Sequence, residues 1–147
     1  MLLGSLRGNV LLGIGLHYTR LFVCLAVFPR LPADDATIYA VLLAWSLTEV
    51  ARYPFYIAPS PATSALRYAC PVLTFPVGAG AEAYACYLLL PLLEAEAAAP
   101  AALRWAAMAQ IGVNSLGGLW AYPPMVRKAA AALSKLSGAP PDKPKAQ

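Results

Sequence analysis

Four long apolar stretches, separated by short segments rich in proline and polar residues, dominate the pattern of hydrophobic and polar positions along the chain. They cover residues 10–28, 38–57, 65–93 and 103–126. Each approaches or exceeds the roughly 20 residues with which an α-helix crosses a bilayer. The pattern therefore predicts an all-α, polytopic bundle of about four transmembrane helices within residues 1–133. We expect the remaining residues, 134–147, to form a basic, disordered cytosolic tail.

The composition agrees with a membrane protein. Of the 147 residues, 60% are hydrophobic and 12% are charged, and the mean hydropathy is +0.60. Soluble domains average about 45–50% apolar and about 25% charged residues. The formal net charge of +4 is concentrated after Val126 and is not interleaved with aromatic residues, so no nucleic-acid partner is predicted. The single histidine and the three cysteines, which all lie in apolar stretches, favour packing residues over a disulfide framework or a metal site.

The first apolar stretch has an alternative interpretation as a signal peptide. Arg7 precedes it, and Leu31-Pro32-Ala33 resembles a cleavage region. However, His17 and Arg20 interrupt the apolar run, which favours a transmembrane helix in which these two residues have interfacial or packing positions. Lysines and arginines gather on the side of the 57–65 connector and after the fourth stretch, so the positive-inside rule predicts that both termini are cytosolic.

Charged residues within the apolar stretches are the first candidates for function, because they are costly at membrane depth. The second stretch carries a stripe with spacings of four, three and four, which places its members on one helical face: Trp45, Glu49, Arg52 and Tyr56. Glu49 and Arg52 can pair within one turn. A structural ion pair and a functional site are both open interpretations of this stripe.

Glu82 lies near the middle of the third stretch and has no cationic neighbour one turn away. Such a carboxyl group needs a partner on another helix or an altered pKa. Tyr68 and Phe75 precede it at intervals of seven and so share its face. A structural hydrogen bond between helices is the alternative to a functional role. In the fourth stretch, Gln110 and Asn114 lie one turn apart among glycines, which indicates interhelical hydrogen bonding.

No Walker loop, G-x-S-x-G, H-E-x-x-H or C-x-x-C motif occurs in the sequence. An intramembrane carboxyl group with tyrosines and arginines towards one membrane face suits three classes of protein. These are a lipid-handling enzyme, a transporter and an assembly subunit.

Three segments resemble the very-long-chain (3R)-3-hydroxyacyl-CoA dehydratases, also called protein-tyrosine-phosphatase-like proteins. The most specific is Ala44–Tyr56, with the letters AWSLTEVARYPFY. Leu66-Arg67-Tyr68 followed by Phe75–Glu82 is similar to the family's catalytic segment. Tyr122–Lys128 resembles its last helix and basic tail, and the resemblance as a whole spans about residues 18–133.

This resemblance implies the third step of the fatty-acid elongation cycle, in which 3-hydroxyacyl-CoA loses water to give trans-2-enoyl-CoA. It implies no cofactor, a location in the endoplasmic-reticulum membrane, and elongase and reductase enzymes as partners. The tyrosine and glutamate of the family pattern Tyr-Pro-x-Gly-x-x-x-Glu carry the chemistry, and the glutamate corresponds to Glu82. Within the segments quoted above, the resemblance implies substrate-binding or supporting roles for Trp45, Glu49, Arg52, Tyr56, Arg67 and Tyr68. Lys143 and Lys145 resemble a lysine-based retrieval signal.

Two departures from the family pattern keep an alternative open. The tyrosine position is occupied by Phe75, which has no ionisable proton, and four helices are predicted where the family has six. A catalytically silent member that acts as a scaffold in the elongation complex is therefore the second hypothesis. An unrelated small transporter subunit is the third, and it leaves the Ala44–Tyr56 match without an explanation.

Overall fold

The computed structural model describes residues 10–96 and 98–137, and these ranges are helical with no strand. The α-helices are α1 (Val10–Phe22), α2 (Ala36–Ile57), α3 (Pro61–Ala95) and α4 (Ala101–Leu136). The predicted all-α class is confirmed. Each helix coincides with one of the four apolar stretches, and the differences lie at the ends of the elements.

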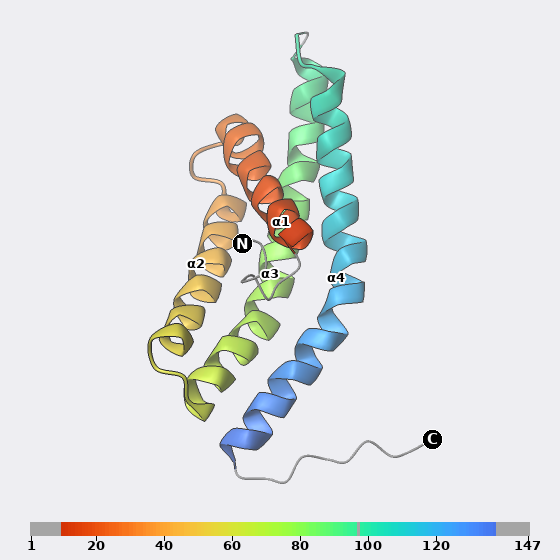
Figure 1. Ribbon diagram of the computed structural model, residues 1–147. Helices are drawn as coiled ribbons and strands as arrows, with labels where there is room; N and C mark the ends of the chain where they lie inside the picture. Colours follow the sequence, from red (N-terminus) through yellow and green to blue (C-terminus); the bar gives the residue numbers. More distant parts are fainter. Residues whose placement is uncertain (1–9, 97, 138–147) are drawn as a thin grey trace, which may run out of the picture.

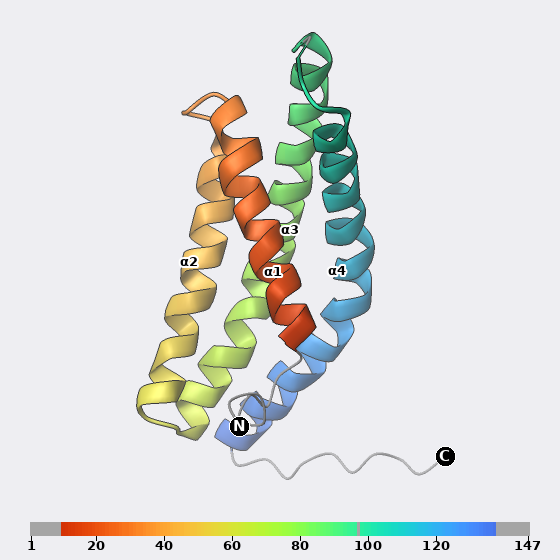
Figure 2. The ribbon, with the colours of Figure 1, turned by 45° about the horizontal axis from the view of Figure 1, so that its top comes forward.

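The helices α2, α3 and α4 lie side by side, and each runs antiparallel to the one before it (Figure 1). The helix α3 is central and packs against both α2 and α4. The helix α1 crosses one face of this layer, as a second view also shows (Figure 2). The chain thus brings α1, α2 and α4 around the middle of α3, where Glu82 lies.

The first stretch does not form one continuous α-helix. After Phe22 it continues as a π-helical segment, η2 (Val23–Val27), and a 3-10 turn, η3 (Phe28–Arg30). Pro29 lies in this 3-10 turn and, having no N–H group, donates no backbone hydrogen bond there. The π-helical segment carries Val23 and Val27, which are fully buried in the core cluster. The change in helix type thus coincides with the place where α1 meets the rest of the bundle.

Side-chain caps fix the beginnings of α2 and α3. The Asp35 carboxylate accepts hydrogen bonds from the hydroxyl and the backbone N–H of Thr37, and these bonds lower the pKa of Asp35. Ser60 and Thr63 form a reciprocal capping box before α3. The helix therefore begins at Pro61, four residues before the predicted 65–93 segment, and it continues through its internal prolines to Ala95.

The helix α4 is longer than the predicted 103–126 segment and continues through Pro123 and Pro124 to Leu136. The alanine-rich sequence after Lys128 favours helix strongly, and Ala129 and Ala132 are buried. The first residues of the predicted disordered tail, 134–136, are thus helical. The retrieval-like lysines at positions 143 and 145 lie outside the described residues.

By length and hydropathy, one described helix, α3, qualifies as a candidate membrane span. The other apolar stretches fall short for different reasons. The π-helical segment shortens α1 to 13 residues, and polar and small residues lower the mean hydropathy of α4. The sequence expectation of four spans is therefore supported by this criterion for α3 alone.

A compact core joins η2 to the C-terminal half of α3. Besides the two valines, its fully buried members include Ala85, Cys86 and Leu89. The interpretation of the cysteines as packing residues holds for Cys86 but is wrong for Cys24, which is exposed.

The helices α2 and α3 approach closely at Gly78, which precedes this core in α3. A Cβ atom on Gly78 would lie 3.1 Å from the Cβ of Ala44.

Candidate active site

Glu82 is a buried carboxylate at the centre of the bundle, with a relative exposure of 8%. Trp45 on α2 donates a hydrogen bond from Nε1 to Oε1 of Glu82 at 2.7 Å. From α4, Gln110 Nε2 and Asn114 Nδ2 donate to Oε2 at 3.1 and 3.2 Å. Three N–H groups from two neighbouring helices thus satisfy both oxygens. The expectations of a partner for Glu82 on another helix and of interhelical bonds from Gln110 and Asn114 are confirmed.

A second polar network joins α1 to α2 beside this carboxylate. Glu49 pairs through Oε1 with Arg20 at 3.1 Å and through Oε2 with Arg52 at 3.3 Å. The Arg20 guanidinium also lies 5.2 Å from the ring centroid of Trp45. The pair of Glu49 with Arg52 matches the helical spacing in the sequence. The sequence predicted only an interfacial or packing position for Arg20, because nothing in a linear sequence shows that this side chain of α1 reaches Glu49 on α2.

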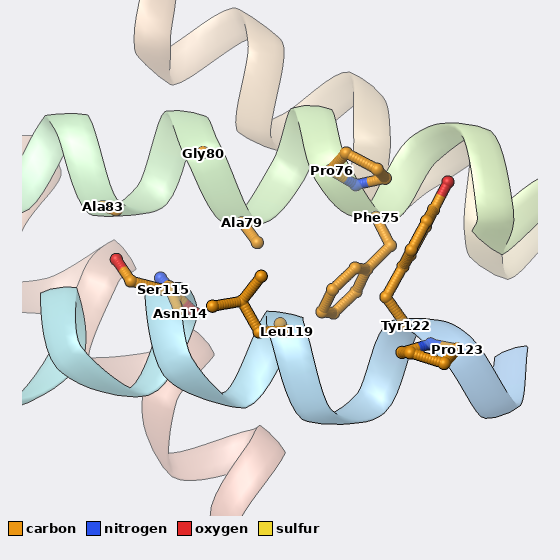
Figure 3. Close-up of a pocket in the computed structure, with 11 residues that line it drawn as sticks. Phe75, Pro76, Ala79, Gly80, Ala83, Asn114, Ser115, Leu119, Tyr122 and Pro123 are labelled. Atoms are coloured by element: carbon orange, nitrogen blue, oxygen red, sulfur yellow. The ribbon is translucent and has the colours of Figure 1, made fainter.

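A cavity of about 620 Å³ lies between α3 and α4 (Figure 3). The residues of its wall are mostly apolar or small, and they are Phe75, Pro76, Ala79, Gly80, Ala83, Asn114, Ser115, Gly118, Leu119, Tyr122 and Pro123. The ring of Phe75 projects from α3 towards α4 and stacks on Tyr122, with ring centroids 6.5 Å apart and an interplanar angle of 20°. A long apolar ligand matches this wall in character.

Tyr122 is a cavity residue whose position the sequence did not reveal. Its hydroxyl donates to the backbone carbonyl of Val72 at 3.1 Å. That carbonyl would normally accept from the residue four positions later, which is Pro76 and has no N–H. Tyr122 therefore satisfies a carbonyl that the proline leaves open, and its hydroxyl is directed to α3 rather than into the cavity. The only signal in the sequence was its place in the Tyr122–Lys128 segment.

Although the sequence places Glu82 on the same helical face as Phe75, Glu82 is absent from the cavity wall. The carboxylate instead points to Trp45 and to the polar side chains of α4. Asn114 connects the two places, since it lines the cavity and also donates to Glu82. One amide side chain thus stands between the carboxylate and the cavity.

The remaining candidate residues gather where α2 meets α3. The Arg67 guanidinium lies 4.6, 4.9 and 5.4 Å from the ring centroids of Phe55, Tyr56 and Tyr68. These are cation–π distances. Tyr56 has an exposed side chain, so the predicted stripe on α2 turns from the bundle towards the surface at this end. Within residues 10–96 and 98–137, no group of three or more His, Cys, Asp or Glu side chains could hold a metal ion.

The profile of the family described as "Protein tyrosine phosphatase-like protein, PTPLA" matches residues 1–135. The chain belongs to this family. It is the family of the very-long-chain 3-hydroxyacyl-CoA dehydratases. No curated protein and no solved structure shows a significant match to the chain.

The pattern Tyr-Pro-x-Gly-x-x-x-Glu, which the sequence resembles, runs over Phe75–Glu82. The proline and the glycine of the pattern are present as Pro76 and Gly78. The glutamate is present as the hydrogen-bonded Glu82, and the tyrosine is replaced by Phe75. The structure shows a buried carboxylate at Glu82, a close approach of α2 to α3 at Gly78, and the aromatic ring of Phe75 in the cavity wall.

Proposed function

We propose that this chain is a membrane-embedded very-long-chain (3R)-3-hydroxyacyl-CoA dehydratase of the fatty-acid elongation cycle. The observation that carries the proposal is the pairing of a buried carboxylate, Glu82, with an apolar cavity one amide side chain away. The acyl chain occupies the cavity between α3 and α4. The elimination breaks the C2–H and C3–O bonds and forms the C2=C3 double bond, and the proton and the hydroxyl leave as water.

Elimination needs a base for the C2 proton and an acid for the departing hydroxyl. Glu82 is the carboxyl group that we assign to this chemistry, because it lies next to the cavity and is held by uncharged donors. It reaches the reacting carbons when the Asn114 side chain or the ligand moves. No cofactor takes part in this scheme, since proton transfers alone balance the reaction.

The CoA head binds at the end of the bundle where α2 meets α3 and where α4 ends (Figure 1). Basic residues of three helices lie towards this end, and they are Arg52, Arg67, Arg127 and Lys128. Among the described residues, Arg67 pairs with aromatic rings and with no carboxylate, so its charge is available to phosphate. By the positive-inside rule, this end and both termini face the cytosol.

The membrane placement rests on apolar side chains that would be costly in water. Large hydrophobic residues on every helix are highly exposed, including Leu25 at 72%, Leu73 at 75% and Trp120 at 83%. Exposed apolar surface of this kind is typical of helices that face lipid. We propose that all four helical segments cross the endoplasmic-reticulum membrane, where elongase and reductase enzymes are the partners.

A catalytically silent scaffold is the second candidate function, and the replacement at Phe75 is the observation that favours it. The stacked pair of Phe75 and Tyr122 places no free hydroxyl at the family's tyrosine position. In this alternative the chain keeps the fold and the acyl-chain cavity. It binds other proteins of the elongation complex but does not catalyse the reaction itself.

A water-elimination assay separates the two functions. The purified chain, in detergent or liposomes, is given a long-chain (3R)-3-hydroxyacyl-CoA, and formation of the trans-2-enoyl-CoA is followed by mass spectrometry. We expect product from the wild type and none from Glu82→Gln. Glu94→Gln is the matched control, because Glu94 is an exposed residue that pairs with Arg104 at the end of α3. Equal measurable rates for the wild type and Glu82→Gln would exclude Glu82 as the catalytic group, whereas no product from the folded wild type would favour the scaffold.

A further inference from the structure

The polar atoms of the cavity wall are few, and they are not equivalent. The Tyr122 hydroxyl is engaged with the carbonyl of Val72. Ser115 is exposed and lies at the wall without contact to Glu82. Asn114 alone belongs to both the wall and the hydrogen-bonded group around Glu82.

The amide of Asn114 has capacity beyond its bond to Glu82. A carboxamide offers two N–H donors and an oxygen with two lone pairs. One N–H is directed at Oε2 of Glu82 at 3.2 Å. Among the described residues no group donates a hydrogen bond to the Asn114 oxygen, and its side chain belongs to the cavity wall. The oxygen is thus the acceptor that remains for a ligand in the cavity.

We infer that Asn114 is a positioning residue that recognises the 3-hydroxyl group of the acyl chain. This inference rests on the proposed function and adds to it the group that distinguishes a 3-hydroxyacyl chain from a saturated one. The Asn114 oxygen accepts the hydrogen bond of the 3-hydroxyl, while Nδ2 keeps its bond to Glu82. C3 and C2 are thereby aligned beside Glu82, which reaches C2 when the Asn114 side chain or the acyl chain shifts, and Asn114 itself transfers no proton.

Gln110 offers a matched comparison within the same site. It lies one helical turn before Asn114 and donates to the same Oε2 atom, at 3.1 Å. It is buried and does not belong to the cavity wall. Removing either amide therefore takes one donor from Glu82, but removing Asn114 alone also takes an acceptor from the cavity.

The experiment measures binding without turnover. The probes are a long-chain 2,2-dimethyl-3-hydroxyacyl-CoA, which has no C2 proton to lose, and the matched 2,2-dimethylacyl-CoA without the hydroxyl. Dissociation constants are measured in liposomes for the wild type, Asn114→Ala, the near-isosteric Asn114→Leu, and Gln110→Ala. A variant that still binds the probe without the hydroxyl is folded, so each affinity ratio has its own internal control.

For one neutral hydrogen bond, we expect the wild type and Gln110→Ala to prefer the hydroxylated probe by roughly 3- to 10-fold. Both Asn114 variants should bind the two probes equally. An unchanged preference in a folded Asn114 variant, or an equal loss in Gln110→Ala, overturns the inference. Equal binding of both probes by the wild type also overturns it but leaves the proposed function intact, whereas no binding of either probe by the wild type removes both.

Discussion

The indole Nε1 of Trp45 lies 2.7 Å from Oε1 of Glu82, and this contact ties α2 to α3 at the centre of the bundle. The Arg20 guanidinium of α1 lies above the same indole ring, 5.2 Å from its centroid. Glu82 in turn accepts from Gln110 and Asn114 on α4. One tryptophan therefore connects the Glu49 network to the Glu82 network, and the two networks together involve all four α-helices.

We expect Trp45→Phe to destabilise the fold by about 1.5–3 kcal/mol, because it keeps an aromatic ring but leaves a buried carboxylate oxygen without its donor. Thermal unfolding in detergent, followed by circular dichroism, measures the change. Trp120→Phe is the control, since Trp120 is 83% exposed on α4. Equal melting temperatures for the two variants would show that the Trp45 hydrogen bond does not stabilise the bundle.

The Glu49 network predicts an order of effects between its two arginines. Arg20 joins two helices, whereas Arg52 pairs within one turn of its own helix. Local pairs of this kind contribute about 0.3–0.5 kcal/mol. We expect Arg20→Met to lower the free energy of unfolding by about 1 kcal/mol or more, because it also removes the cation–π contact with Trp45.

Double-mutant cycles with Glu49→Gln provide the measurement for this order. The coupling energy of Glu49 with Arg20 should exceed that of Glu49 with Arg52. The reverse order would mean that the contact between α1 and α2 contributes little, and that the Glu49–Arg52 pair acts within α2.

Two glycines of α3 provide a matched pair for the close approach of α2. A Cβ on Gly78 would lie 3.1 Å from the Cβ of Ala44, whereas a Cβ on Gly80 would meet nothing within 4 Å. We expect Gly78→Ala to destabilise by about 1–3 kcal/mol through overpacking. Gly80→Ala should be neutral or stabilising by up to about 1 kcal/mol, because alanine favours helix. Melting temperatures of the two variants test this, and a similar change in both would contradict a specific contact at Gly78.

The sequence predicted the helices and the hydrogen bonding of Glu82 to other helices, because apolar length and an isolated charge are properties of the chain itself. Helix ends were less predictable. The capping box of Ser60 and Thr63 extended α3, and the alanines after Lys128 extended α4. Contacts between helices could not be predicted, since the pairing of Arg20 with Glu49 depends on how α1 and α2 are arranged in space.

The cavity shows the same limit more clearly. Phe75 and Glu82 are seven residues apart, about two helical turns, and so were expected on one face. In the structure, Phe75 contacts Tyr122, whereas Glu82 contacts Trp45 and Gln110. The side chains available on α2 and α4 decide which contact each residue of this face makes. The periodicity of a sequence predicts which residues share a helical face, but it does not predict which residues of other helices each of them contacts.

The last prediction concerns the missing hydroxyl. The Phe75 ring lies in the cavity wall, with its Cζ atom 4.0 Å from where a Cβ on Gly118 would be. Because residue 118 is glycine, no side chain of that residue fills the space beside this edge of the ring, and we expect a hydroxyl added at Cζ to fit next to α4. We expect Phe75→Tyr to raise kcat/KM for long-chain (3R)-3-hydroxyacyl-CoA by roughly 10²–10⁴-fold, the usual contribution of general acid–base assistance.

Tyr122→Phe is the control for that gain, because it keeps the stacked ring and removes the only tyrosine hydroxyl in the cavity wall. Its hydroxyl is bonded to the Val72 carbonyl that Pro76 leaves open, so its loss should lower stability by about 1–3 kcal/mol and leave the rate of the folded protein unchanged. Water elimination by the wild type, both single variants and the double variant is compared at a temperature where all are folded. If Tyr122→Phe abolishes the wild-type activity, then Tyr122 has taken over the function of the lost tyrosine, and Phe75→Tyr should restore activity in the double variant. If Phe75→Tyr gives no gain in a protein that binds substrate, the absent hydroxyl does not limit this chain, and the scaffold function becomes the better account.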